Sequence, residues 1–125
     1  MKAILFVFLG GGLGSLVRFL SSKLIPISKA VFPWPTLIVN LMGCLLIGIL
    51  FSWALKNNLF RSDLYLFVAV GFCGGLTTFS TFSLEGIEFL KTGNYSAFIS
   101  YTLLSIIGGL VMVALGFSLI RFPNS

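Results

Sequence analysis

Charged residues are scarce in this 125-residue sequence, and histidine is absent. Asp, Glu, Lys and Arg make up 9% of the residues, whereas a soluble domain carries about 25%. Apolar residues make up 58%. This composition excludes an ordinary soluble domain and indicates a membrane protein. Because histidine is the commonest acid–base group and metal ligand, its absence leads us to expect no enzyme.

Cysteine is also rare, and the few basic residues form no stripe. Cys44 and Cys73 lie inside apolar stretches without a CxxC partner, so we expect packing residues rather than a redox or metal site. Lys and Arg outnumber Asp and Glu by 8 to 3, but they stand at the ends of apolar stretches. This placement argues against a nucleic-acid partner.

Hydropathy predicts an all-α integral membrane protein with four spans, at about 3–24, 34–55, 64–90 and 95–120. The links between the spans are short, so residues 1–125 form a single transmembrane domain. The first apolar run has no A-x-A-like cleavage site and contains Arg18. We therefore interpret it as a retained helix rather than a signal peptide.

The third predicted span contains an unusual cluster of small and hydroxyl residues. Its 27 residues would form a helix of about 40 Å, against a hydrocarbon core of about 30 Å. Three glycines weaken the helix at residues 71–75, and five hydroxyl residues follow at 77–83. The pattern predicts a broken helix, which is typical of ion sites near the midplane. Alternatively, Gly71 and Gly75 only allow close helix packing.

Polar and aromatic residues in the spans allow two interpretations each. Arg18 either lines a charged pore mouth or snorkels to the surface. The Asn40 carboxamide either bonds a neighbouring helix, which the residue alone favours, or offers its NH₂ group to an anion. Phe79 and Phe82 share a helix face and either pack in the core or meet an anion with their ring edges.

Further candidates stand in the first, third and fourth spans. Tyr101 and Ser105 share a stripe that either bonds a neighbouring helix or lines an ion path. Gly10 and Gly14 form a GxxxG pair, which favours close helix contact. Glu85 lies towards the end of the third span, and we expect it to be peripheral.

Basic residues are almost equally divided between the two ends of the spans. Four stand on the N-terminal side and three on the other, with Arg18 close to the latter: Lys2, Lys56, Arg61 and Arg121 against Lys23, Lys29 and Lys91. Orientation normally follows an excess of Lys and Arg on the cytoplasmic side. The near tie predicts insertion in both orientations and permits an antiparallel homodimer with a site at its midplane.

Three motifs together resemble a known family, the small fluoride channels called Fluc or CrcB proteins. They are Gly10-x-x-x-Gly14-x-x-x-Arg18-Phe19, Thr36-Leu37-x-Val39-Asn40-x-x-Gly43, and Gly71-Phe72-Cys73-Gly74-Gly75-Leu76-Thr77-Thr78-Phe79-Ser80-Thr81-Phe82-Ser83-x-Glu85. The third motif is the most specific, and the resemblance runs nearly from end to end.

The resemblance implies a fluoride-selective channel in a prokaryotic inner membrane, which passively exports F⁻ and gives fluoride resistance. It implies an antiparallel, dual-topology homodimer with two pores and a central structural Na⁺ held by carbonyls of Gly74 and Thr77. The implied pore residues are Asn40, Phe79, Phe82, Tyr101 and Ser105, with Thr78 as a further candidate; we add Arg18 at the mouth and Glu85 as a possible vestibule residue. Gly109 replaces a further hydroxyl of the family's polar track.

Two other functions are weaker candidates. A proton-coupled small multidrug exporter needs a titratable carboxylate deep in the bundle, and the first, second and fourth spans contain no Asp or Glu. A non-transporting membrane assembly subunit would explain the glycines. It would not explain why hydroxyls, Asn40 and a weakened helix occur together.

Overall fold

The computed structural model describes residues 1–24 and 32–120, and within these ranges the chain forms helices and no strand. In the described part of the chain, four helical segments are long and apolar enough to cross a membrane: Lys2–Leu24, Trp34–Asn57, Asp63–Lys91 and Tyr95–Ile120. The predicted all-α class with four spans is therefore confirmed. Lys29 and Arg121, which enter the predicted charge balance, lie outside the described residues.

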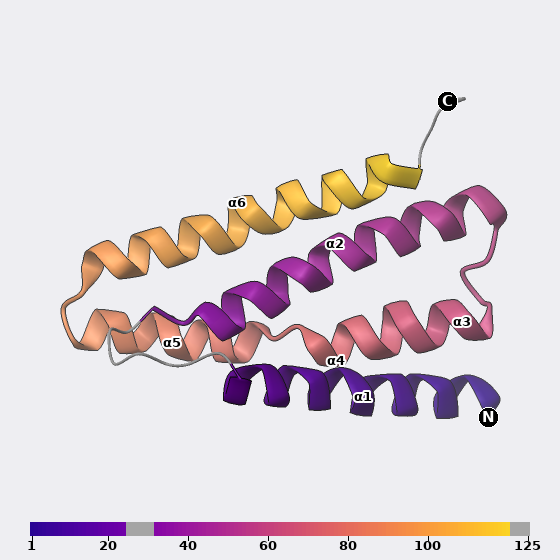
Figure 1. Ribbon diagram of the computed structural model, residues 1–125, viewed down its shortest axis with the longest axis horizontal. Coiled ribbons are helices and arrows are strands. Elements are labelled where there is room, and N and C mark those ends of the chain that lie inside the picture. The colour runs from indigo at the N-terminus through magenta and orange to yellow at the C-terminus, as the bar shows by residue number, and fades with distance from the viewer. Residues whose placement is uncertain (25–31, 121–125) are drawn as a thin grey trace.

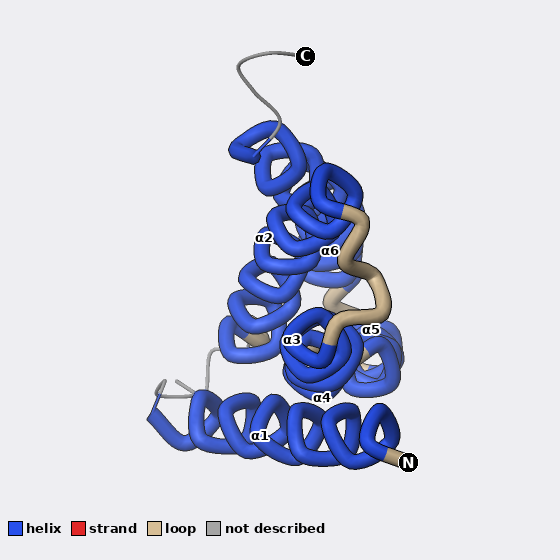
Figure 2. The backbone as a smooth tube through the Cα atoms, turned by 90° about the vertical axis from the view of Figure 1, so that its right-hand side faces the viewer, coloured by secondary structure: helices blue, strands red, loops and turns tan. Residues whose placement is uncertain are grey.

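Successive spans run in opposite directions, so the start of the first span and the end of the fourth lie at the same end of the bundle (Figure 1). The first, second and fourth spans are α1 (Lys2–Leu24), α2 (Trp34–Asn57) and α6 (Tyr95–Ile120). The third span lies between α1 on one side and the α2–α6 pair on the other, as Figures 1 and 2 both show. Helix α2 packs along α6, and α1 packs along the first half of the third span.

The third span consists of four helical pieces rather than one uniform helix. They are α3 (Asp63–Tyr65), the π-helix η1 (Leu66–Cys73), α4 (Gly74–Leu76) and α5 (Phe79–Lys91). Between α4 and α5, Thr77 (φ −87°, ψ 156°) and Thr78 (φ −149°, ψ 119°) have extended backbone angles. We call these two residues the α4–α5 junction. The π-helix was not expected from the sequence, and π-helical turns occur frequently at functional sites.

Glycines allow α1 to pack closely against the third span. A Cβ atom added at Gly10 would collide with the Phe67 carbonyl oxygen, and one at Gly14 with the Phe72 carbonyl oxygen. The predicted role of this GxxxG pair in close helix contact is therefore confirmed. Gly48 and Gly116, which the sequence analysis did not single out, make the same kind of contact between α2 and α6.

The glycines of the third span keep helical geometry. Gly71 approaches α1 at Gly10 and Val7, Gly75 approaches the Gly11 carbonyl, and Gly74 has ordinary helical angles (φ −63°, ψ −37°). Extended backbone begins only at Thr77. Helix packing therefore explains two of the three glycines, although the sequence suggested that they weaken the helix.

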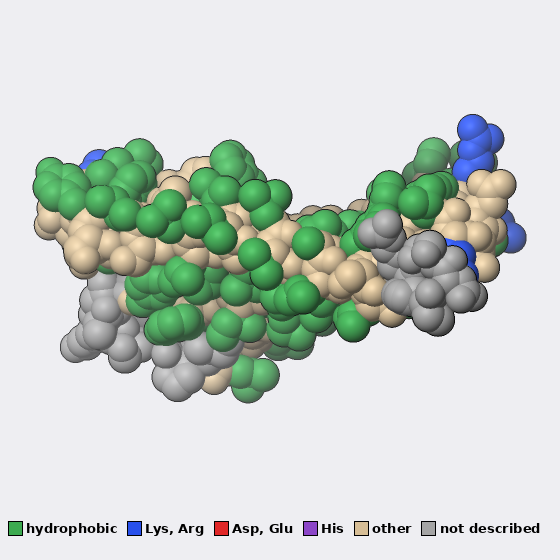
Figure 3. Space-filling view, turned by 90° about the horizontal axis from the view of Figure 1, so that it is seen from above, with side chains coloured by type: hydrophobic (Ala, Val, Ile, Leu, Met, Phe, Trp, Pro, Cys, Tyr) green, Lys and Arg blue, Asp and Glu red, His purple; other side chains and the backbone are tan. Residues whose placement is uncertain are grey.

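The outer surface of the bundle is largely apolar. Large apolar side chains are exposed along all four spans, including Phe8, Met42, Leu84 and Leu110. In Figure 3 hydrophobic side chains cover the length of the molecule, and Lys and Arg side chains lie near its two ends. Such a surface suits contact with lipid or with other transmembrane helices.

We predict that Gly14→Ala destabilises the protein whereas Gly12→Ala does not. The added methyl group at position 14 meets the backbone of Phe72 and Leu76, while a Cβ atom at Gly12 has no neighbour within 4 Å. Overpacking of this kind costs about 1–3 kcal/mol. Thermal unfolding of the purified variants in detergent measures the difference. Equal melting temperatures for the two variants would contradict the close α1 contact.

Candidate functional site

The Asn40 carboxamide makes two hydrogen bonds to the α4–α5 junction. Asn40 stands on α2, and its Nδ2 donates to the Thr78 carbonyl oxygen at 3.2 Å. In return, the Thr78 amide donates to Asn40 Oδ1 at 2.8 Å. The structure therefore shows the interhelical role of Asn40 that the sequence favoured. One of the two N–H groups on Nδ2 makes the bond to Thr78, which leaves the second for another acceptor.

These bonds change the hydrogen bonding at the end of α4. In a continuous α-helix the Thr78 amide would donate to the Gly74 carbonyl oxygen, four residues earlier. Here that amide donates to Asn40, so the Gly74 carbonyl loses its usual helical donor. The preceding turn closes normally, because the Thr77 amide donates to the Cys73 carbonyl oxygen at 3.1 Å.

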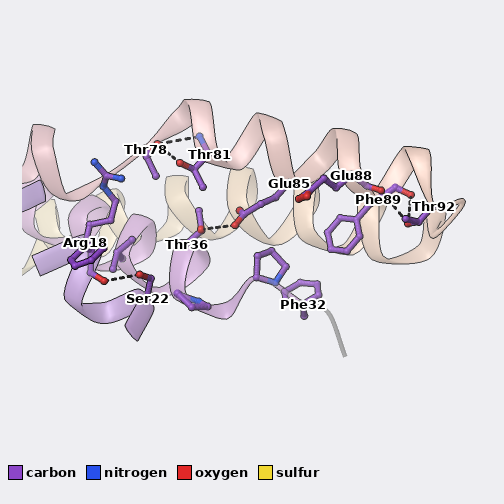
Figure 4. A pocket seen from close by; sticks show the side chains of 14 residues that line it. Arg18, Ser22, Phe32, Thr36, Thr78, Thr81, Glu85, Glu88, Phe89 and Thr92 are labelled. Carbon is purple, nitrogen blue, oxygen red and sulfur yellow. Dashed lines mark hydrogen bonds between the residues drawn. The ribbon is translucent and has the colours of Figure 1, made fainter. Parts of the chain in front are cut away.

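Other side chains satisfy polar groups on both sides of the junction. Arg18 Nε of α1 donates to the Gly75 carbonyl oxygen at 3.1 Å, and Figure 4 shows this side chain extending towards the junction. On the other side, Thr78 caps α5, because its Oγ1 accepts the Thr81 amide at 3.2 Å. Arg18 thus lies at the junction rather than snorkelling away from it.

Glycine 43 brings α2 close to the junction. A Cβ atom added at Gly43 would collide with the Thr77 Cγ2 methyl group. The Thr77 side chain is held in place, since its Oγ1 donates to the Cys73 carbonyl oxygen at 3.0 Å. Gly43 follows Asn40 by three residues and so lies on nearly the same face of α2. Gly43 belongs to the second of the three sequence motifs, but nothing in the sequence predicted its contact with Thr77.

A cavity of about 390 Å³ beside the junction collects most of the predicted site residues. We call it the junction cavity. Its lining includes Asn40, Gly74, Thr77, Thr78, Phe79, Phe82 and Ser105. The Ser105 hydroxyl oxygen is buried, and it has no hydrogen-bond partner among the described residues. Buried polar atoms are normally paired, so this hydroxyl is free to bond an occupant of the cavity.

Two aromatic residues of the predicted pore have different environments. The Phe79 side chain is 78% exposed on the surface of the single chain. Phe82 packs inward, with its ring centroid 5.9 Å from that of Phe79 and 5.1 Å from that of Tyr101. Tyr101 lies behind Phe82 and is fully buried. Phe82 therefore separates Tyr101 from the exposed ring of Phe79.

Glu85 joins three helices through its carboxylate. Thr36 Oγ1 of α2 donates to Glu85 Oε2 at 2.9 Å, and the Tyr101 hydroxyl of α6 donates to Glu85 Oε1 at 2.7 Å. Glu85 thus lies near the end of its span, as expected, but it is not isolated there, because its carboxylate accepts hydrogen bonds from both α2 and α6. The sequence position of Glu85 could not predict these bonds, because they depend on which helices pack beside it.

A second cavity, of about 530 Å³, lies beside this carboxylate. We call it the Glu85 cavity. Figure 4 shows Arg18 towards one end of it, Glu85 and Glu88 towards the other, and Thr78 and Thr81 between them. Thr78 lines both cavities. The α4–α5 junction therefore stands between a cavity with charged side chains and one with hydroxyl, amide and aromatic groups.

Gly109 and the two cysteines also lie close to the junction cavity. A Cβ atom at Gly109 would lie 3.4 Å from Cys44 Sγ, and both Cys44 and Cys73 line the cavity wall. Both thiols are free. Among the described residues, no group of three or more His, Cys, Asp and Glu could hold a metal ion.

Comparison with known proteins matches this chain over nearly its whole length. The family model described as "CrcB-like protein, Camphor Resistance (CrcB)" matches residues 5–117. The chain is 46% identical over 123 residues to a fluoride-specific ion channel FluC of Azobacteroides pseudotrichonymphae, which covers 98% of both chains. Proteins of the same name from Bacteroides fragilis (44%) and Phocaeicola vulgatus (41%) match 93% of this chain and 94% and 96% of their own. This chain belongs to the CrcB family.

Proposed function

We propose that this protein is a fluoride-selective ion channel that lets F⁻ leave the cytoplasm down its gradient and so gives fluoride resistance. Curated relatives named fluoride-specific ion channels cover almost the entire chain, and four helices can span a membrane. The observation within the structure that best supports this function is the unpaired Ser105 hydroxyl in the junction cavity. Neither an exporter nor an assembly subunit accounts for these relatives.

The junction cavity offers suitable groups for a small dehydrated anion. Fluoride must exchange its hydration shell for donors fixed in the protein. Ser105 and Thr78 offer hydroxyl groups, and Asn40 has a second N–H group. The ring edges of Phe79 and Phe82 carry partial positive charge. Among the described residues, no Lys or Arg that would trap the ion lines this cavity.

We further propose that the working channel is an antiparallel homodimer of chains inserted in opposite orientations, with two pores. The nearly equal number of basic residues on the two sides supports dual insertion. The exposed Phe79 ring supports assembly, because it stands beside the junction cavity without cover from its own chain. In this proposal the third span acts as a broken helix at the seam between the copies.

A structural Na⁺ ion would suit the carbonyl groups at the α4–α5 junction and in α4 just before it. The Gly74 carbonyl lacks its helical donor, and Thr77 has extended backbone angles. Space is available beside Gly74, where an added Cβ atom would have no neighbour within 4 Å. Carbonyls freed at interrupted membrane helices are suitable Na⁺ ligands. We propose that Gly74 and Thr77 hold the ion, which would supply a fixed positive charge beside the anion path.

Purified protein in liposomes tests the channel function directly. We expect rapid passive release of F⁻ from loaded vesicles, measured with a fluoride electrode, and little release of Cl⁻ in a parallel chloride measurement. A channel with preorganised donors needs no second ion gradient. Fluoride release no faster than from protein-free vesicles, or equal release of both halides, would contradict the proposal.

We predict that Ser105→Ala lowers fluoride flux about tenfold or more. A hydrogen bond to a charged partner contributes about 1.5–3 kcal/mol, and every 1.4 kcal/mol corresponds to about a factor of ten. Ser118→Ala on the same helix is the matched control, because its exposed hydroxyl donates only to the Leu115 carbonyl. Equal flux from the two variants would remove Ser105 from the anion path.

Labelling in intact cells tests the orientation of the chain. Single cysteines replace Asn57 or Ser96, which are exposed at opposite ends of the bundle, in a background with Cys44→Ser and Cys73→Ser. With dual insertion, we expect an impermeant thiol reagent to label about half of the copies at each site. Full labelling of one site and none of the other would show a single orientation.

A further inference from the structure

We propose that Asn40 is a positioning residue for the cation site: its carboxamide oxygen captures the Thr78 amide and thereby keeps the Gly74 carbonyl available to Na⁺. This inference rests on the proposed function, because it deepens the role of the junction in a fluoride channel. It assigns different roles to the two polar atoms of the carboxamide: Oδ1 accepts the Thr78 amide, and Nδ2 supplies a donor to the junction cavity.

The assignment begins with the acceptors open to the Thr78 amide. An N–H group in hydrocarbon needs a partner, because an unsatisfied polar group there costs several kcal/mol. Within the chain its two alternatives are Gly74 O, as in a regular helix, and Asn40 Oδ1. The second bond is the one present, at 2.8 Å. Removal of the Asn40 oxygen therefore favours closure of the helix onto the Gly74 carbonyl.

The surrounding contacts make this choice specific to a side chain of the length of asparagine. The reciprocal bond from Nδ2 to the Thr78 carbonyl, at 3.2 Å, orients the carboxamide in its plane. Close packing of Gly43 on the Thr77 methyl group holds α2 at the distance that both bonds require. Arg18 donates to the neighbouring Gly75 carbonyl, and within the described residues it does not bond Gly74. Gly74 O is thus the carbonyl left for a cation.

Substitutions at position 40 can separate the role of the carboxamide oxygen from that of the carboxamide nitrogen. Asn40→Asp keeps an oxygen that can accept the Thr78 amide, although it loses the bond to the Thr78 carbonyl, and it removes the N–H donors from the junction cavity. We therefore expect it to retain the cation site and to lose fluoride flux. Asn40→Ala removes both functions. Ser105→Ala is the matched control, because it changes the same cavity without touching the junction.

The measurement is the melting temperature of the full-length protein in detergent, in NaCl and in N-methylglucamine chloride at equal ionic strength. An ion that binds only the folded state raises the melting temperature with its concentration. We expect a sodium-dependent rise for wild type, Ser105→Ala and Asn40→Asp, and a loss of most of this rise for Asn40→Ala. Fluoride flux, measured separately, should fall in all three variants.

The outcomes distinguish this inference from the channel function. Fluoride flux in the wild type tests the function alone. An undiminished sodium-dependent rise in Asn40→Ala would overturn the role of Asn40, and so would the absence of any such rise in a conducting wild type. If Asn40→Ala does not fold, the Asn40→Asp variant tests the inference. A sodium-dependent rise in its melting temperature supports the role of the Asn40 oxygen, and loss of that rise in folded Asn40→Asp refutes this role.

Discussion

Backbone without regular helical hydrogen bonds is costly inside a membrane, and the structure depends on how the α4–α5 junction meets this cost. Thr78 receives partners for both its amide and its carbonyl from the single carboxamide of Asn40. Its hydroxyl caps the next helix through Thr81. Arg18 satisfies the Gly75 carbonyl from the other side. Side chains of α1, α2 and α5 therefore satisfy polar groups at the extended residues and just before them, as unwound backbone in hydrocarbon requires.

These polar contacts require the helices to approach closely, and the glycines make this possible. Gly10 and Gly14 bring α1 against the backbone of the third span, which places Arg18 within reach of Gly75. Gly43 plays the same part on α2 for Asn40. Small residues and polar residues are thus not alternative explanations of this sequence. The first set provides the separation at which the second set forms hydrogen bonds.

The junction also organises the two cavities. On one side lie Arg18 and the Glu85 carboxylate, which Thr36 and Tyr101 hold between α2 and α6. On the other side lies the junction cavity with the Ser105 hydroxyl. Thr78 contributes to both walls.

Hydropathy by itself determined the four spans, and the spacing of Gly10 and Gly14 determined a close contact, because both depend on local composition and helical period. The resemblance carried by the motifs identified the family. Only the tertiary structure decided that Asn40 bonds Thr78 and that the Glu85 carboxylate joins α2 and α6. Each of these facts joins segments far apart in the chain, and a side chain's sequence position does not reveal which helix faces it.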